Sequence, residues 1–272
     1  MTLVVCWRDN QSLTVVADTK ISAEGLVTYT DGGPKIFQVP ITAYAIEEEK
    51  IRRRTYPSMG FAYAGSTLIA QSVLAMASTC LQNLSGDIDR LGPSMLEVAD
   101  LFLKCATQYT KEMLFWRPKQ YPGFEALIFG FCPKLGDYLV YHLMTTIDGE
   151  MVNMRHEGHY AVVGSAFSIG SGVEEFRRIF EDYKVRGEAI TAFENFELVL
   201  TGCKVPSVGG SRQYATATSQ GVDLVPVMIP VEGEDFGCRI EVLGCDVLRL
   251  GPVGDYSIAH KVMGPHPNNP MR

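Results

Sequence analysis

Short runs of β-branched and aromatic residues, separated by polar turns, occupy the first forty residues. Residues 3–7 (LVVCW) and 13–17 (LTVVA) flank a polar stretch, a pattern that is typical of a β-hairpin. Shorter strands are predicted at residues 28–30 and 35–39, because the turn DGGP (31–34) separates them. The chain is therefore expected to begin in a β-sheet.

The spacing of apolar residues then lengthens to three and four, which predicts helices. The first is expected over residues 66–84 with Ser66 as N-cap, and the second over residues 94–114 after Pro93. A second helical pair is predicted over residues 173–183 and 188–202. Further strands are expected at 124–132, 137–146, 159–164, 212–219, 222–229 and 239–250.

The charged run EEEKIRRR (47–54) interrupts the pattern between two strands. Its opposite charges predict a solvated loop or an exposed helix face with no chemical role. The order of elements is strands, two helices, strands, two helices and strands. Such segregated blocks favour antiparallel sheets with helices packed outside them, hence an α+β fold. No change in composition marks a linker, so one domain is expected.

Composition and charge narrow the class of protein. The 272 residues are 46% hydrophobic and carry a net charge of −7, which is unfavourable for binding nucleic acid or an anionic membrane. No apolar run is long enough to cross a bilayer, and Trp7, Arg8 and Asp9 cut short any signal-peptide core. The seven cysteines form no CxxC pair, so we predict reduced thiols in a cytoplasmic protein without a zinc site.

Five residues at strand ends suggest a catalytic centre when they are taken together. They are Thr2, Asp18 in VADTKIS, Lys35 in GGPKIF, Gly65 in FAYAGST and Ser165 in AVVGSAFS. Singly, each has an ordinary explanation, such as a turn residue for Asp18, a surface cation for Lys35 or a helix-entry glycine for Gly65. Their combination fits one mechanism, in which an N-terminal threonine supplies both a nucleophile and a base.

In that mechanism the hydroxyl of Thr2 attacks and its own α-amine, which titrates near pH ~8, accepts the proton. A neighbouring Lys35 ammonium lowers the pKa of that amine further, and Asp18 keeps Lys35 charged and oriented. The N–H of Gly65 would donate to a developing oxyanion. Ser165 would form a hydrogen bond with the amine. Thr2 is small enough for methionine aminopeptidase, so we expect Met1 to be removed.

These residues, their order and their spacing resemble the proteasome β-subunit branch of the N-terminal-nucleophile hydrolases, including its bacterial homologues. The separation of Thr2 from Asp18 matches the family, and Lys35 is displaced by about one residue. The resemblance covers residues 2–229. It implies a four-layer αββα sandwich of two antiparallel sheets as domain 1–229. Residues 230–272 extend past the usual end of the family, and we expect them to pack on the same domain as a C-terminal extension with a loosely ordered, Pro- and Asn-rich tail.

The resemblance also implies a threonine-type peptidase with Thr2, Asp18, Lys35, Gly65 and Ser165 as catalytic residues. The peptidase would need no cofactor and no metal, act on a peptide or unfolded protein, and assemble into a homo-oligomeric ring or ring-like assembly. Whether it has an ATPase partner stays open from the sequence. By position, Ser22 and the backbone of Lys20 would pair with an extended substrate. Phe37 and Tyr63 would shape the pocket for the residue before the cleaved bond.

One position departs from the family pattern. An Asp is expected before a Ser and paired glycines, but the stretch TGCKVPSVGGSRQY (201–214) has Cys203 and Lys204 there. The absence of this Asp leaves three alternatives: a weakened site, a substitute such as Ser207 or Ser211 that orients the amine, or a protein that keeps the fold without activity. The segment 44–57 and the segment after Pro230 are also longer than usual, and either would cover a ring surface or alter the contacts between subunits.

Three functions remain open from the sequence: a threonine peptidase, an amidase or acyl transferase with the same nucleophile and a small-molecule substrate, and a non-catalytic structural subunit. Two weaker sequence motifs do not support a fourth function. His156 and His159 have a metal-like spacing without a third ligand nearby, which favours a solvated loop. The GSAFSIGSG stretch has no P-loop lysine, so it does not predict a nucleotide site.

Overall fold

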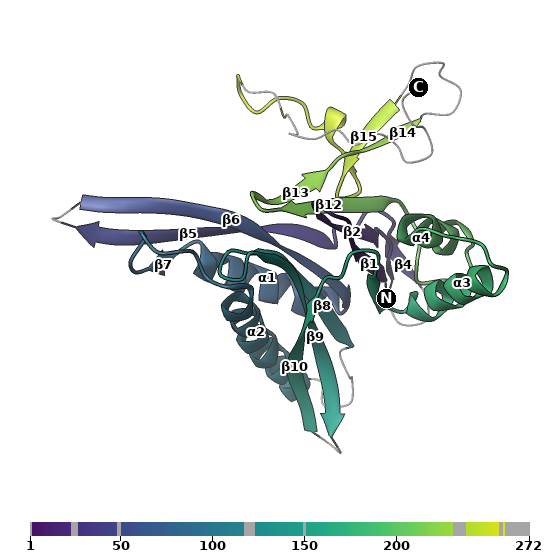
Figure 1. Ribbon diagram of the computed structural model, residues 1–272, viewed down its shortest axis with the longest axis horizontal. Coiled ribbons are helices and arrows are strands. Elements are labelled where there is room, and N and C mark those ends of the chain that lie inside the picture. Colours follow the sequence, from purple (N-terminus) through teal and green to yellow (C-terminus); the bar gives the residue numbers. More distant parts are fainter. Residues whose placement is uncertain are drawn as a thin grey trace.

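The computed structural model describes residues 2–22, 27–47, 50–116, 123–148, 151–230, 238–255 and 258 (Figure 1). Two larger antiparallel sheets and four α-helices form its body. None of the helices in these ranges has the length and apolar character needed to span a membrane. The predicted mixture of helices with antiparallel sheets is confirmed, apart from one short parallel pairing between β5 (Ile36–Glu47) and β7 (Leu84–Ser85).

The larger sheet has six strands in the order β10-β9-β8-β6-β5-β7. Apart from the β5–β7 pair, neighbouring strands in this sheet run antiparallel. The strands are β5 (Ile36–Glu47), β6 (Lys50–Gly65), β7 (Leu84–Ser85), β8 (Phe124–Cys132), β9 (Asp137–Asp148) and β10 (Met151–Tyr160).

The second sheet has five strands in the order β11-β1-β2-β12-β13, all antiparallel. The strands are β1 (Leu3–Arg8), β2 (Leu13–Asp18), β11 (Ala166–Gly170), β12 (Arg212–Thr218) and β13 (Gly221–Val225). The hairpin predicted at the start of the chain is the β1–β2 pair, and it lies in the middle of this sheet.

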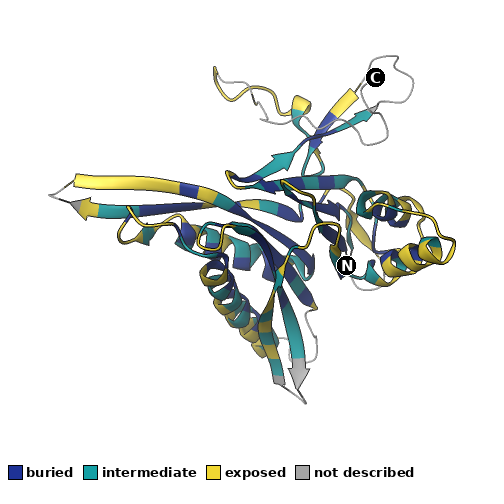
Figure 2. Cartoon of the chain, in the orientation of Figure 1, coloured by how far each residue is buried: buried dark blue, intermediate teal, exposed yellow. Residues whose placement is uncertain are grey.

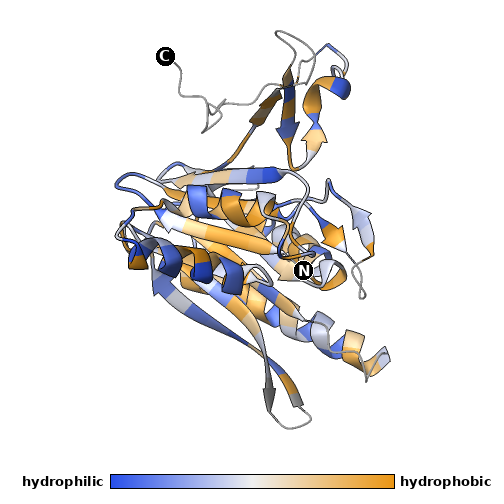
Figure 3. Cartoon of the chain, turned by 90° about the vertical axis from the view of Figure 1, so that its right-hand side faces the viewer, coloured by the Kyte–Doolittle hydropathy of each residue, from blue (hydrophilic) through white to orange (hydrophobic). Residues whose placement is uncertain are grey.

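Three hydrophobic clusters join these elements. One packs α1 (Thr67–Leu81) and α2 (Met95–Trp116) against the six-stranded sheet. A second lies between the two sheets, where Val4 and Val15 meet Phe129. The third packs α3 (Val173–Val185) and α4 (Ala192–Thr201) against the outer face of the five-stranded sheet. Figure 3, which looks toward α3 and α4, shows hydrophobic residues concentrated on the central strands.

The helix starts follow their capping residues. The Ser66 hydroxyl accepts from the Ile69 N–H at the start of α1, as predicted. α4 begins at residue 192, four residues later than expected, because Thr191 and Glu194 form a capping box that fixes its first turn. The residues before Thr191 therefore form the connection to α3 rather than a helical turn.

The charged run at residues 47–54 differs from its prediction. Instead of a loop or a helix face, its described residues, Glu47 and 50–54, continue the paired strands β5 and β6, with Ile46 opposite Ile51 and Glu47 opposite Lys50. This part of β5 and β6 projects from the body in Figure 1, and residues 50–55 are exposed in Figure 2. The arginines of the run lie opposite uncharged residues of β5, so backbone pairing rather than the charge pattern makes this segment a strand.

The residues after β13 form a separate three-stranded sheet, β14-β15-β16, followed by a short 3₁₀ helix. Its strands are β14 (Val227–Pro230), β15 (Cys238–Val242) and β16 (Cys245–Asp246). The boundary predicted at residues 229 and 230 thus lies inside β14. The small sheet contacts the body where Gly244 approaches Gly32. The predicted loose tail, residues 264–272, lies outside the described residues.

Candidate active site

Thr2 lies at the buried start of β1, between the five-stranded sheet and β6. It is only 2% exposed. Its carbonyl oxygen accepts from the N–H of Gly172 at 3.3 Å, beyond the end of β11. Because β1 pairs with both β2 and β11, the position of Thr2 is fixed by strand register on two sides. Met1 lies outside the described residues.

Asp18 and Lys35 form an ion pair beside Thr2. The Nζ atom of Lys35 lies 2.9 Å from Oδ1 of Asp18, and the same Oδ1 accepts from the N–H of Leu3 at 2.9 Å. Their side chains are 1% and 0% exposed. One carboxylate oxygen therefore joins the lysine ammonium to the residue that follows Thr2. This brings together three of the predicted catalytic residues.

Backbone donors complete the environment of Asp18. Its Oδ2 accepts from the N–H groups of Lys20 and Gly209, each at 3.2 Å. Burial raises the pKa of Asp18, and the charge of Lys35 and the N–H groups of Leu3 and Gly209 oppose that shift. Burial likewise lowers the pKa of Lys35 below its ordinary value, against the attraction of Asp18. Ionisable groups whose pKa is shifted by burial and a specific charge partner are frequent at functional sites, which makes Lys35 a candidate.

Two glycines allow the close approach of strands around Thr2. Gly170 has φ +96°, and a Cβ on it would collide with the carbonyl oxygen of Thr2 and lie 3.1 Å from Cβ of Ala64. Gly65, the next residue after Ala64, has φ +91° and would collide with the carbonyl oxygen of Gly123. Gly65 is therefore placed within one residue of the Thr2–Gly170 contact, at the junction from β6 to α1.

Ser171 is a site residue that the sequence reasoning missed. Its Oγ donates to the carbonyl oxygen of Thr2 at 3.4 Å and lies 2.8 Å from Oγ of Ser207. The two hydroxyls thus form a chain that ends at Thr2. The signal was present in SIGSG (168–172), where glycines on both sides of a serine mark a strand end that makes a close approach.

Ser165 is a correction, because the structure does not bring it to Thr2. Residue 3 pairs with residue 170 and residue 7 with residue 166, so Ser165 lies beyond the opposite end of β1. There its Oγ donates to the carbonyl oxygen of Val162 at 2.7 Å, on an exposed turn. At about 3.4 Å per residue, the strand separates Ser165 from Thr2 by too great a distance for the expected hydrogen bond to the amine.

The loop before β12 holds the other predicted amine-orienting residues. Ser207 is buried and reaches Thr2 through Ser171, as described above. Ser211 instead binds Thr19, donating its N–H to Oγ1 at 2.6 Å and accepting from the Thr19 N–H at 3.1 Å. At the position of the missing carboxylate, Cys203 is exposed, and the ammonium of Lys204 lies 3.5 Å from Glu175 on α3.

The predicted substrate-lining residues are distributed beside the site. Tyr63 is buried, stacks on Phe37 with ring centroids 6.4 Å apart, and donates its hydroxyl to the carbonyl oxygen of Pro34 at 3.3 Å. The N–H of Lys20 is already bonded to the carbonyl oxygen of Gly209 at 3.0 Å. Pairing with a peptide would therefore use the carbonyl oxygen of Lys20. Ser22 lies in β3 (Ile21–Ser22), which pairs with β4 (Thr28–Thr30).

The histidines are engaged with neighbouring side chains. Nε2 of His156 lies 2.6 Å from Asp100, and His159 packs against Phe167 with ring centroids 4.9 Å apart. Both lie in strand β10 rather than in the loop expected from the sequence. Within the described residues, no group of three or more His, Cys, Asp or Glu side chains has the arrangement of a metal site.

No protein-family model matches the sequence, and no curated protein matches it. Among solved structures, the chain is similar to the Anbu (Gly-1) mutant from Hyphomicrobium sp. strain MC1. The TM-score is 0.55 at 15% identity, and the match covers 82% of this chain and 85% of that chain. At this identity the likeness concerns the fold alone. The fold of this chain is similar to that of Anbu, a bacterial proteasome-like protein.

Proposed function

We propose that the chain is a threonine-type peptidase of the N-terminal-nucleophile class, with Thr2 as nucleophile after removal of Met1. The observation that carries the proposal is the buried Oδ1 atom of Asp18, which binds Nζ of Lys35 and the N–H of Leu3, both at 2.9 Å. A fully buried ion pair costs desolvation free energy and is weak evidence for stability. Its position next to a buried N-terminal threonine favours a catalytic role.

In the proposed reaction, Oγ1 of Thr2 attacks the carbonyl carbon of the substrate while the α-amine of Thr2 takes the hydroxyl proton. The Lys35 ammonium favours the neutral amine, because two neighbouring positive charges repel. The N–H of Gly65 stabilises the oxyanion. Collapse breaks the C–N bond, and the amine product leaves with the proton. Water then hydrolyses the ester on Thr2, releasing the acid and restoring the hydroxyl.

The hydroxyls of Ser171 and Ser207 provide a substitute for the carboxylate that is absent at Cys203 and Lys204. They are joined at 2.8 Å, and Ser171 contacts the carbonyl oxygen of Thr2. Because Thr2 is buried, a free amine on it would need hydrogen-bond acceptors from neighbouring side chains. A serine hydroxyl can accept a hydrogen bond as well as donate one. We assign Ser171, rather than Ser165, to the orientation of the amine.

The packing of two helices, two sheets and two helices supports assignment to the four-layer αββα sandwich of this class. Under the proposal, residues 1–229 form the hydrolase domain and the later strands are an appendage. The similarity in fold to a proteasome-like protein favours an oligomeric assembly. Size-exclusion chromatography with light scattering tests that expectation, and a monomer at micromolar concentration would contradict it.

A threonine-directed epoxyketone tests the nucleophile directly, because it forms a covalent adduct with both the hydroxyl and the amine of an N-terminal threonine. We expect the adduct to map to Thr2 by mass spectrometry and to be absent in Thr2→Ala. Ser165→Ala serves as a matched control that keeps its labelling. A processed chain that is not labelled would favour a non-catalytic structural subunit over the peptidase.

Intact mass spectrometry tests the required processing. The protein purified from its own host is expected to lack the mass of Met1. Retention of that mass would leave Thr2 without a free amine, and the proposed base would not exist.

A further inference from the structure

The side chain of Gln213 is buried beside the Asp18–Lys35 pair, with only 1% of its surface exposed. Its Oε1 accepts from the N–H of Lys35 at 2.9 Å and from the N–H of Ile36 at 3.3 Å. Its Nε2 donates to the carbonyl oxygens of Asp18 at 3.2 Å and Gly33 at 2.9 Å. These bonds use both lone pairs and both N–H groups of the amide. One side chain therefore joins the backbone of both charged residues.

Gln213 occupies a position in β12 that packing alone does not explain. Residues 213, 215 and 217 alternate along the strand and therefore share a face. Ala215 and Ala217 belong to the hydrophobic cluster between the two sheets. An apolar residue at position 213 would bury no polar group, whereas an amide must recover its desolvation free energy through hydrogen bonds. A fully bonded amide in such a layer fixes the relative position of the groups that it joins.

The two groups that Gln213 joins come from different sheets. Asp18 ends β2 of the five-stranded sheet, and Lys35 immediately precedes β5 of the six-stranded sheet. The carbonyl oxygen of Lys35 accepts from the N–H of Tyr63 on β6 at 3.2 Å. The backbone of Lys35 is thus bonded to its own sheet through Tyr63 and to the opposite sheet through Gln213. Its side chain starts from that fixed point and reaches Oδ1 of Asp18 at 2.9 Å.

We propose that Gln213 is a positioning residue for the peptidase, holding the backbone of Lys35 where its ammonium reaches Asp18. This inference rests on the proposed function, and Gln213 acts through Lys35 and Asp18 rather than on the substrate. A shift of the Lys35 backbone would carry the ammonium away from Oδ1 of Asp18. Misplacement by about 1 Å in an active site can lower a rate about 100-fold.

Gln213→Met tests the proposal, because methionine has nearly the same length and makes none of the four hydrogen bonds. A separate bond, from the N–H of Gly33 to the carbonyl oxygen of Thr19 at 2.7 Å, keeps the turn before Lys35 attached to the end of β2. We expect the rate of epoxyketone labelling at Thr2 to fall about 10-fold to 100-fold.

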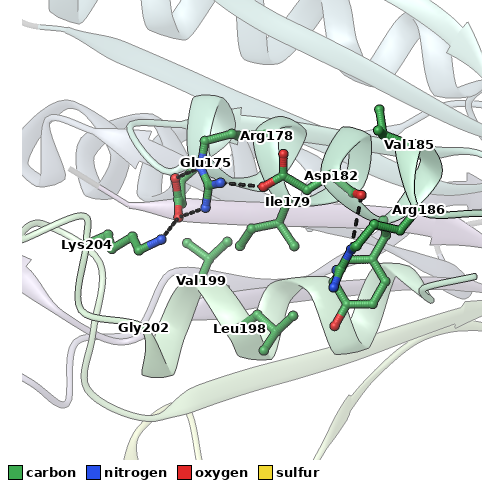
Figure 4. A pocket seen from close by; sticks show the side chains of 11 residues that line it. Glu175, Arg178, Ile179, Asp182, Val185, Arg186, Leu198, Val199, Gly202 and Lys204 are labelled. Carbon is green, nitrogen blue, oxygen red and sulfur yellow. Dashed lines mark hydrogen bonds and ion pairs between the residues drawn. The ribbon is translucent and has the colours of Figure 1, made fainter. Parts of the chain in front are cut away.

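Asn195 provides a matched control, because it is a second buried amide in a different layer. Its Nδ2 donates to the carbonyl oxygen of Phe176 at 2.8 Å and so joins α4 to α3. Figure 4 shows the groove between the same two helices, where Arg178 binds Glu175 and Asp182. Asn195→Leu should lower stability, as measured by urea denaturation, and leave the labelling rate within about twofold of the wild type.

The titration of Lys35 is a readout that a loss of stability alone would not move. In protein labelled with ¹³C at Cε of lysine, the NMR signal of Lys35 is identified by its absence in Lys35→Met. Without Gln213 the attraction of Asp18, which raises the pKa of Lys35, weakens while burial still lowers that pKa. The midpoint should therefore move to lower pH in Gln213→Met and stay unchanged in Asn195→Leu.

Gln213→Asn replaces the methionine variant if the latter does not fold. It keeps an amide that is one methylene too short to bind both segments, so we expect the same two changes at smaller size. A folded variant at position 213 that keeps the wild-type labelling rate or the wild-type titration of Lys35 would overturn the assignment.

The two readouts separate this inference from the proposed function. A wild-type chain that the epoxyketone does not label, with a titration of Lys35 that shifts in Gln213→Met, has the positioning residue without the peptidase activity. A wild-type chain that is labelled at Thr2, with a titration that does not shift, has the peptidase centre without this role for Gln213.

Discussion

The two ends of strand β1, which pairs with β2 and β11, each lie beside a cation–carboxylate pair, and the two pairs differ in burial. At the Thr2 end, the Lys35–Asp18 pair is 1% and 0% exposed. At the other end, Arg8 binds Asp137 at 2.8 Å, but the two side chains are 19% and 36% exposed. Water can solvate the charges at the second end and cannot reach them at the first. A charged side chain therefore needs an oppositely charged partner only at the Thr2 end.

The difference also explains the two serines. Ser171 and Ser165 follow and precede β11, which is five residues long, so they lie at opposite ends of the same strand. Both are next to a glycine in GSAFSIGSG, and a local pattern does not distinguish them. The antiparallel pairing of residue 3 with residue 170 decides which serine meets Thr2.

Removing the buried cation should have the largest effect. Lys35→Met leaves Asp18 buried without its counter-charge, and we expect a loss of about 3–5 kcal/mol in the free energy of unfolding at pH 7. Asp137→Asn, at the solvated end, should cost about 1 kcal/mol or less. Urea denaturation of both variants measures the difference. Equal losses would contradict the contrast between the two ends.

A second comparison uses two glycines with positive φ near the ends of β11. Gly170→Ala adds a Cβ that collides with the carbonyl oxygen of Thr2, whereas Gly164, at φ +80°, has nothing within 4 Å of the same position. Both variants incur backbone strain of about 1 kcal/mol. Gly170→Ala should lose at least about 2 kcal/mol more, because packed backbone must move. Thermal unfolding of the two variants measures the difference in stability. Equal losses would contradict the close approach at Gly170.

A third comparison concerns activity rather than stability. If the proposed function holds, Ser171→Ala should lower kcat/KM for peptide hydrolysis by about 10-fold to 100-fold, because the amine loses an orienting hydroxyl. Ser165→Ala should stay within about twofold of the wild type. Ser171→Thr restores a hydroxyl and should recover part of the loss. A larger effect from Ser165→Ala than from Ser171→Ala would reverse the assignment.

The smallest effect expected is a shift in the pH dependence of kcat/KM. The mechanism needs charged Lys35, so activity falls as pH rises through the pKa of Lys35. Burial lowers that pKa below 10.5, which places the alkaline fall below the value for an ordinary lysine. Asp18→Asn removes the attraction that raises the pKa, so the fall should move to still lower pH. Asp137→Asn should leave it unchanged, and a shift of the Asp18→Asn profile to higher pH would exclude this role for Asp18.

Much of the architecture follows from local patterns. The polar turn between residues 7 and 13 separates two apolar runs that form a hairpin, and Ser66 begins a helix because its hydroxyl satisfies an N–H of the first turn. The class of fold could be predicted in the same way, and the grouping of Thr2, Asp18 and Lys35 could be predicted as well. Thr2 and Asp18 stand at the same end of the β1–β2 hairpin, and Lys35 precedes β5 of the other sheet, so their grouping followed from the shared mechanism and the family resemblance rather than from spacing.

Other features depend on contacts distant in sequence. The charged run at residues 47–54 predicts a loop or a helix face, but its described residues form strand because β5 pairs with β6. Ser171, and not Ser165, reaches Thr2 because of a register between residues about 167 apart. Gln213 binds the N–H of Lys35 through a contact between residues 178 apart.

The sequence by itself determined which side chains this protein has for chemistry and which segments can form strands or helices, because those properties depend on residue type and near neighbours. The tertiary structure alone decided which serine stands beside Thr2 and which carboxylates lose their water. Register and burial are set by the packing of whole sheets, since a shift of one residue would turn every side chain of a strand to the opposite face.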